Sequence, residues 1–348
     1  MLETVLQWGI LLVMYRGKRV LLIIGLLLLL SYKSANILFP SQAGIQHSYI
    51  NSSLSLIVEP EQGITPILSA IAAATSSVDM VMYQLEDTQV QKALVQDAAR
   101  GVAVRVLLNK GYYGAQENDK NVPAYQYLSS NGVSVHWTPA HFALTHQKTI
   151  VIDRHRAYIM TLNLTPQYYA SGREFAIVDT DTLDVSAIES TFDSDWNDAP
   201  GAAARGNDLV WSPGSETVLL SLINNATSTL DIYNEEMADT PIINALEDAA
   251  RRGVVVRVDM TYSKSWKKAL TALSTAGVQV HTYAASAPLY IHAKVVIADG
   301  AQAFVGSENF SSNSLKKNRE LGLIIESPVV IDQLQKVFEK DWSGASLF

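Results

Sequence analysis

Residues 68–105 read LSAIAAATSSVDMVMYQLEDTQVQKALVQDAARGVAVR, and residues 220–257 read LSLINNATSTLDIYNEEMADTPIINALEDAARRGVVVR. The two stretches align without a gap at an offset of 152 residues, so that Arg100-Gly101 falls on Arg252-Gly253. A duplication of this length indicates that one folding unit occurs twice in the chain.

Each copy alternates helical and strand patterns. In the first copy, apolar residues at helical spacing predict helices over 64–74 and 90–99, and an Arg-Gly stop precedes a β-branched strand over 102–108. The second copy repeats this order over 216–226, 242–250 and 254–260. Strands that alternate with helices of this length predict an α/β fold.

The composition of the chain sets the expected domain limits. The small, polar segment NDAPGAAARGN at 197–207 has the character of a linker. We therefore assign the first repeat to residues 45–200 and the second repeat to residues 201–348. Residues 1–44 stand apart from both as a signal peptide or membrane anchor with its linker.

The N-terminal segment predicts export or membrane attachment. Arg16, Lys18 and Arg19 precede the uninterrupted apolar run VLLIIGLLLLL at 20–30, which is the pattern of a secretory signal. These 11 residues are short for a bilayer span, which takes about 20. A cleaved signal and a retained anchor both stay open, as does a start at Met14 instead of Met1.

Charge and cysteine content narrow the function. The net charge is -8 and there is no cysteine, which excludes disulfides, thiolate zinc sites and cysteine nucleophiles. Proteins that hold nucleic acid by its phosphates usually carry a basic surface. The acidic balance therefore argues against a nucleic-acid partner, although a local basic groove would still permit one.

A second shared block lies near the end of each copy, now at an offset of 146 residues. It reads HQKTIVID at 146–153 and HAKVVIAD at 292–299, which are both H-x-K-x4-D. An Asn follows each Asp after ten residues, and a Glu follows each Asn after eleven. These residues are Asn163 and Glu174 in the first copy, and Asn309 and Glu320 in the second.

Strand geometry groups these side chains. Residues two apart share a face of a β-strand, so His146 points with Lys148 and His292 points with Lys294. Asp299-Gly300 is a hairpin signal, so a returning strand follows. By the same rule the returning strands present a hydroxyl beside an amide in each copy: Thr161 with Asn163, and Ser307 with Asn309.

This set of groups suits attack on a phosphodiester. Lysines neutralise its charge, and amides and hydroxyls donate to its non-bridging oxygens. A neutral histidine can attack phosphorus while a protonated one gives a proton to the leaving oxygen, and histidines with separated pKa values do both near neutral pH. Zinc held by the histidines and glutamates is the competing interpretation, but the paired lysines would repel a metal.

With its duplicated H-x-K-x4-D motif, the chain resembles the phospholipase D superfamily over roughly residues 55–345. The resemblance implies two similar α/β sandwich halves, each a mixed sheet flanked by helices, related by a pseudo-two-fold axis with one active site between them. It also implies a covalent phosphohistidine intermediate and neither a metal nor another cofactor.

The resemblance also implies residue roles. His146 would be the nucleophile and His292 the general acid. Four acidic residues would support them, two by orienting the imidazoles and two as structural residues: Glu174 and Glu320, then Asp153 and Asp299. The first copy departs from the family pattern at Met160 and Thr161, where Gly-Ser is usual, so Met160 either packs in the core or narrows the pocket.

The expected substrate is a phospholipid at a membrane surface, with no obligatory protein partner. We expect a phosphodiesterase that hydrolyses, or transfers, the phosphatidyl group. A cardiolipin synthase-like transferase ranks second, because such enzymes tend to be longer and to carry two transmembrane helices. An exported nuclease with the same motif, and a non-catalytic membrane-associated binding module, are the remaining alternatives.

Overall fold

The computed structural model describes residues 53–111, 120–199 and 201–348. The predicted leader at 1–44 lies outside these residues. Within the three described ranges, no helix is both long and apolar enough to cross a lipid bilayer.

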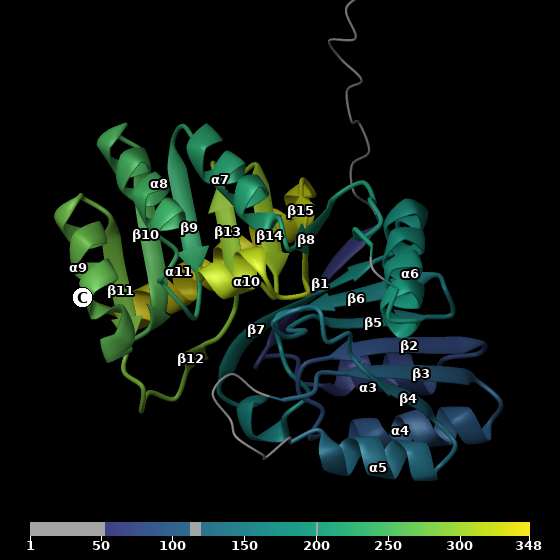
Figure 1. The fold of residues 1–348 in the computed structure, drawn as a ribbon. Coiled ribbons are helices and arrows are strands. Elements are labelled where there is room, and N and C mark those ends of the chain that lie inside the picture. The colour runs from purple at the N-terminus through teal and green to yellow at the C-terminus, as the bar shows by residue number, and fades with distance from the viewer. Residues whose placement is uncertain (1–52, 112–119, 200) are drawn as a thin grey trace, which may run out of the picture. The chain divides into compact units, whose positions relative to one another are not determined.

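Two mixed sheets form the framework (Figure 1). The first half contributes β1 (Leu54–Glu59), β2 (Ser77–Met82), β3 (Ala103–Leu108), β4 (Ser134–Trp137), β5 (Lys148–Ile152), β6 (Arg156–Met160) and β7 (Gly172–Asp179). The second half contributes β8 (Leu209–Ser212), β9 (Thr229–Tyr233), β10 (Val255–Thr261), β11 (Gln279–Tyr283), β12 (Tyr290–Ile291), β13 (Val295–Ala298), β14 (Gln302–Gly306), β15 (Glu320–Ile325) and β16 (Ser346–Leu347).

The two sheets have the same strand order. The first runs β1-β7-β6-β5-β2-β3-β4, and the second runs β8-β15-β14-β13-β9-β10-β11 and then β16. In both sheets the two neighbours β2 and β3, or β9 and β10, are parallel, while the motif strand β5 or β13 is antiparallel to β2 or β9. The expectation of two similar α/β halves with mixed sheets is confirmed.

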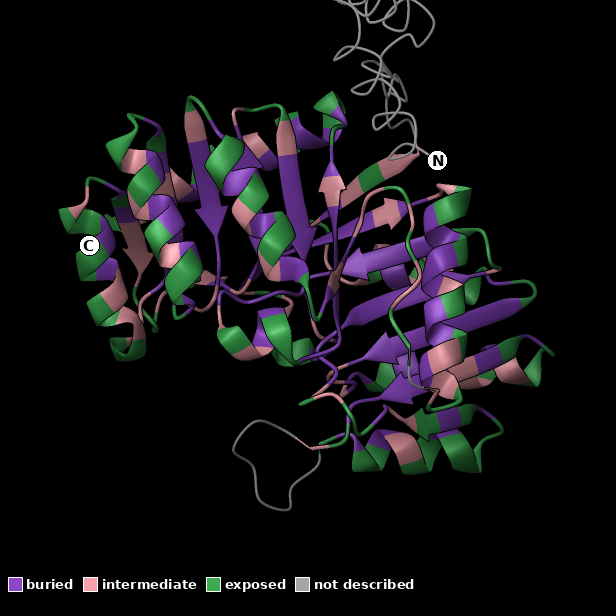
Figure 2. Cartoon of the chain, turned by 45° about the horizontal axis from the view of Figure 1, so that its top comes forward, coloured by how far each residue is buried: buried purple, intermediate pink, exposed green. Residues whose placement is uncertain are grey.

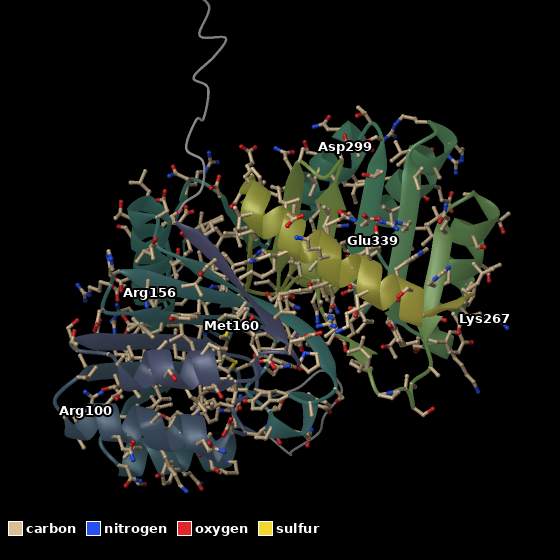
Figure 3. All side chains as sticks on the ribbon, turned by 180° about the vertical axis from the view of Figure 1, so that it is seen from behind. Arg100, Arg156, Met160, Lys267, Asp299 and Glu339 are labelled. Atoms are coloured by element: carbon tan, nitrogen blue, oxygen red, sulfur yellow. The ribbon has the colours of Figure 1, made fainter. Side chains whose placement is uncertain are left out.

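Helices cover both faces of each sheet. Those of the first half are α3 (Thr65–Ala72), α4 (Thr88–Ala99), α5 (Val122–Ser130) and α6 (Thr182–Trp196). Those of the second half are α7 (Ser215–Asn225), α8 (Thr240–Arg251), α9 (Lys267–Thr275), α10 (Ser312–Lys316) and α11 (Pro328–Gly344). Figure 1 shows α7, α8 and α9 along one face of the second sheet, and Figure 3 shows α11 crossing the other face.

Strand alternation explains the two helix layers. Successive strand residues face opposite sides of a sheet. In the first half, Met80 and Val106 share a core with Leu94 of α4, whereas the adjacent Val81 and Leu107 pack with α6. The central strands are therefore buried along most of their length, as Figure 2 shows, and such strands are mostly apolar.

Equivalent residues begin and end the repeated helices. Asp87 caps α4 by accepting a hydrogen bond from the Gln89 N–H at 2.7 Å, and Asp239 caps α8 by accepting one from the Ile242 N–H at 3.1 Å. The helices end before Gly101 and Gly253, whose φ angles of 92° and 93° are in the left-handed region that glycine tolerates. The Arg-Gly stops predicted from the sequence are confirmed.

A third core joins the two sheets. It brings Val151 and Phe175 of the first half together with Val295 and Leu321 of the second, and Phe338 of α11 packs against it. Each half also has its own core beneath its helices. The centre of the contact between the halves is therefore an apolar, buried core.

Candidate active site

The two histidines lie on segments that cross between the halves. Thr145 pairs with Arg319, and Ile291 of β12 pairs with Arg173 of β7 in the equivalent way. The His146 N–H donates to the Arg319 carbonyl at 2.9 Å, while the Ala293 N–H donates to the Arg173 carbonyl at 3.0 Å. This repeated crossing brings both H-x-K segments to one place.

Each histidine is held by the glutamate of the other half. Nδ1 of His146 lies 2.8 Å from Oε2 of Glu320, so Nε2 is the ring nitrogen that this contact does not occupy. Nδ1 of His292 lies 2.5 Å from Oε1 of Glu174, although its angle is not that of a regular hydrogen bond. Burial alone would raise the pKa of both carboxyls, but the adjacent imidazole and lysine outweigh it and lower both pKa values.

The two lysines are buried and differ in their partners. The Lys148 ammonium donates to the His146 carbonyl at 2.6 Å and lies 5.2 Å from the centroid of the Tyr83 ring. Lys294 donates to the His292 carbonyl and lies 3.1 Å from a carboxylate oxygen of Glu235. Burial, and then repulsion by Lys294, lowers the pKa of Lys148 to about 7, so a bound anion would favour its charged form.

A cavity of ≈ 390 Å³ lies between the histidines. The lining residues predicted from the sequence are His146, His292, Asn163, Asn309 and Glu174. A second cavity of ≈ 430 Å³ also reaches His146 and Asn309. The structure therefore brings both imidazoles and both amides of the motif to one polar space.

The two predicted hydroxyl groups face away from this space. The Thr161 hydroxyl donates to Glu174 at 2.5 Å and accepts from the Phe175 N–H, while the Ser307 hydroxyl accepts from the Leu321 N–H. Both residues are fully buried, and neither lines the cavity. The strand-face argument does not reach them because β6 and β14 end one residue earlier.

The motif aspartates act far from the histidines. Asp153 accepts hydrogen bonds from the backbone and hydroxyl groups of Thr75 and Ser76, and Asp299 does the same for Thr227 and Ser228. Asp299 lies at the outer end of the second half in Figure 3. The two aspartates therefore stabilise the loops that precede β2 and β9. These contacts fit the structural role that the resemblance implies, and not a direct contact with the imidazoles.

The sequence left open whether Met160 packs in the core or narrows the pocket. Its side chain is fully buried in the core beneath α3 and α4 and is labelled within the first half in Figure 3. It does not line either cavity at the site. The departure from the usual glycine is therefore a core substitution.

Glu235 is a site residue that the motif analysis missed. Its Oε2 lies 3.1 Å from Nε2 of His292 and 3.1 Å from Nζ of Lys294, and its Oε1 accepts from the Tyr290 hydroxyl at 3.1 Å. Burial alone would raise its pKa, but His292 and Lys294 outweigh this and hold the pKa well below the usual range. The repeat carried a signal for it, because the offset of 152 places Glu235 on Tyr83, within two residues of the ends of the equivalent strands β9 and β2.

The two imidazoles have opposite electrostatic environments. Burial and the charge of Lys148 lower the pKa of His146. Burial also acts to lower the pKa of His292, but Glu174 and Glu235 outweigh it and raise that pKa. Near neutral pH the site therefore favours one neutral and one protonated imidazole.

The comparison with protein families agrees with this geometry. The family model described as cardiolipin synthase, PLD-like domain, matches residues 67–196 and 219–342, which include both H-x-K-x4-D motifs. The chain belongs to the phospholipase D superfamily. Its site accordingly is that of a phospholipase D superfamily enzyme.

Curated relatives of the chain extend over most of its length. Cardiolipin synthase A of Pseudomonas entomophila (strain L48) is 25% identical over 338 residues, which cover 85% of this chain and 69% of the relative. Phospholipase D Z of Dictyostelium discoideum is 26% identical over 363 residues, covering 81% of this chain and 85% of the relative.

A solved structure shows the same phospholipase D fold. The phosphatidylserine synthase of Haemophilus influenzae Rd KW20 matches with a TM-score of 0.67 at 12% identity, over 85% of this chain and 87% of that chain. At this identity the likeness is one of fold alone.

Proposed function

We propose that this superfamily member transfers the phosphatidyl group of a phospholipid to an alcohol, through a phosphohistidine on His146. The observation that carries the proposal is the placement of both imidazoles on one cavity, each with its Nδ1 against a glutamate of the other half. The cardiolipin synthase family model and relatives favour transfer over hydrolysis. We therefore place transfer first, which reverses the order drawn from the sequence.

In the first step, Nε2 of His146 attacks phosphorus and the bond from phosphorus to the leaving oxygen breaks. His292 gives its Nε2 proton to that oxygen, so the alcohol leaves neutral. The amides of Asn163 and Asn309, which line the cavity, donate to the phosphoryl oxygens. Lys148 and Lys294 are buried and line neither cavity, so they neutralise the phosphate charge from beside the histidines.

In the second step, the acceptor alcohol gives its proton to the now neutral Nε2 of His292. The acceptor oxygen attacks phosphorus, and the bond from phosphorus to His146 breaks. Each step inverts phosphorus, so the product retains the configuration of the substrate. Water in place of the alcohol would yield phosphatidic acid instead.

Two joined cavities support an alcohol as acceptor. The second cavity shares Tyr83, His146, Glu236 and Asn309 with the first. Its further lining is rich in hydroxyl and amide side chains: Ser311, Asn313, Ser314 and Asn318. Such groups suit a polyol head group, while the acyl chains stay in a membrane to which a leader at 1–44 would bring the enzyme.

The test uses the full chain with vesicles of phosphatidylglycerol and phosphatidylethanolamine, with and without added glycerol, in excess EDTA. Mass spectrometry should find new phosphatidyl lipids that exceed phosphatidic acid when an alcohol is present. His146→Asn should abolish both products. EDTA should have no effect, because lysines occupy positions where a metal enzyme places carboxylates.

Other results would replace the proposal. Phosphatidic acid as the sole product would establish hydrolysis, and cleavage of single- or double-stranded DNA without lipid turnover would establish a nuclease. Vesicle binding with no turnover of either substrate class would establish a binding module.

A further inference from the structure

The repeated motif alone does not distinguish the two histidines. Each has a lysine two residues later and a glutamate of the other half at Nδ1. A symmetric site of this kind gives no reason for one imidazole to attack and the other to donate a proton. The residues at the equivalent positions 83 and 235 break this symmetry.

Tyr83 places an aromatic ring beside His146. The two ring centroids are 4.6 Å apart at an interplanar angle of 68°, an edge-to-face contact. An aromatic ring stabilises a charged imidazole far less than a carboxylate does, and Lys148 adds a positive charge two residues away. The environment of His146 therefore disfavours protonation.

Glu235 places a carboxylate beside His292 at the equivalent position. Its Oε2 is 3.1 Å from Nε2, the nitrogen that Glu174 does not contact. Tyr290, which stands where the first copy has Leu144, donates to its other oxygen at 3.1 Å. The groups facing His292 are thus two carboxylates, the Tyr290 hydroxyl and the ammonium of Lys294.

We propose that Glu235 assigns the two roles, by keeping His292 protonated as the acid and so leaving His146 as the nucleophile. The inference rests on the proposed function, because roles exist only if the two-histidine chemistry occurs. Glu235 acts through His292, so it is a positioning residue. An entering phosphodiester takes the place of its Oε2 at Lys294, while Tyr290 retains Oε1.

The test compares three variants of the full-length enzyme by the pH dependence of kcat/KM. Glu235→Gln should move the alkaline limb to lower pH by at least about one unit, because a nearby carboxylate raises a histidine pKa by this order. Glu235→Asp keeps the charge and should restore most of the limb. Glu326→Gln, which removes a carboxyl that lines neither cavity, should leave the limb in place.

A leaving-group comparison separates this effect from a folding defect. A nitrophenyl phosphodiester releases nitrophenolate, which needs no proton to leave. With this substrate, Glu235→Gln should form the phosphohistidine at a rate within about threefold of wild type. With a phospholipid, the same variant at alkaline pH should slow about tenfold or more. A structural defect would slow adduct formation with both substrates alike.

The converse substitution tests the first copy. Tyr83→Glu adds a carboxylate beside His146 and should move the acid limb to higher pH. If neither Glu235→Gln nor Tyr83→Glu moves its limb while wild type still forms a phosphohistidine, the inference is wrong and the proposed function stands. If wild type forms no phosphohistidine, the proposed function itself is wrong.

Discussion

At the scale of single residues, two neighbouring buried carboxyls show how environment decides a role. Glu320 accepts from the Ser314 hydroxyl at 2.6 Å and the Asn318 amide at 2.9 Å, in addition to its contact with His146. Within the described ranges, neither oxygen of Glu308 has a hydrogen-bond partner. Burial and the nearby Glu320 charge raise the pKa of Glu308 well above its usual range, which favours its neutral form.

These environments predict opposite responses to the same substitution. Glu320→Gln should lower kcat/KM by about 10²- to 10⁴-fold, because an orienting carboxylate fixes the histidine tautomer. Glu308→Gln exchanges a neutral acid for a neutral amide of the same shape and should change kcat/KM by less than about threefold. Equal losses in the two variants, measured on the same phospholipid, would show that Glu320 supports the fold and not His146.

Sequence spacing indicated most of the site but not all of it. The equal downstream spacing of two H-x-K-x4-D blocks predicted both imidazoles and both amides, which line the cavity, and both lysines, which are buried beside it. The repeat carried this prediction and not the strand-face rule, because β5 and β13 begin after the histidines. The same rule misplaced Thr161 and Ser307, since the strands end before them. Glu235 belongs to the other shared block, and an alignment that seeks identical residues passes over a position where the copies differ.

At the scale of elements, the motif aspartates hold the start of a strand against a tight turn. Asp153 and Arg154 have φ angles of 55° and 54°, as do Asp299 and Gly300 at 54° and 61°, which suit a hairpin turn with positive φ at both central residues. Asp153 accepts from the N–H groups of Thr75, Ser76 and Ser77 at 2.7–3.0 Å. These bonds outweigh the opposing effect of burial and hold the Asp153 pKa well below its usual range.

The hydrogen bonds that Asp153 accepts, called the Asp153 cap below, predict an effect on stability that depends on pH. Asp153→Asn should lower the free energy of unfolding by about 1–2 kcal/mol at pH 7, with little change in kcat, since it weakens several hydrogen bonds to a charged acceptor. Because the pKa of Asp153 is lower in the folded state than in the unfolded state, its carboxylate stabilises the fold at pH values above its unfolded-state pKa, which is near 4. This stabilisation is lost as the pH falls below that value. Denaturant titrations should therefore show the difference shrinking below about pH 4; a constant difference at all pH values would contradict the cap.

Helix positions were predictable to within about two residues at either end because capping and stop signals are local. The strand-to-strand crossing between the halves was not predictable in this way. Periodicity shows which side chains share a face, but not which sheet edge that face meets. The sequence therefore identified Glu174 and Glu320 without indicating that each holds the histidine of the other half.

At the scale of the whole molecule, buried ion pairs join the halves beside the site. Arg173 of β7 contacts Asp341 of α11 with two hydrogen bonds at 2.6 and 2.9 Å, and both side chains are at most 2% exposed. Arg319 and Asp195 form the equivalent pair. In each half, the Arg of the ion pair directly precedes the glutamate that contacts a histidine. The ion pairs between the halves and the site therefore depend on adjacent residues of the chain.

Two substitutions on α11 test the weight of this interface. Asp341→Ala should lower the free energy of unfolding by about 3 kcal/mol or more, because it leaves the buried Arg173 with only the Glu59 carbonyl and the partly exposed Glu61 carboxylate as acceptors. Asp332→Ala, on the same helix, removes an exposed pair with Lys336 and should cost under about 0.5 kcal/mol. Similar losses in both variants, from denaturant unfolding, would show that the buried pair adds no special stability.

Trapping the covalent intermediate tests the central claim most directly. A nitrophenyl phosphodiester labelled at phosphorus, whose leaving group needs no proton, would be mixed with His292→Asn enzyme and quenched within milliseconds to seconds. We predict an acid-labile label that peptide mapping places on His146, and none on His146→Asn. Label on His292 in the wild-type enzyme would reverse the roles of the two histidines. The account would be contradicted if the wild type turned over the substrate with inversion at phosphorus while neither variant formed an adduct.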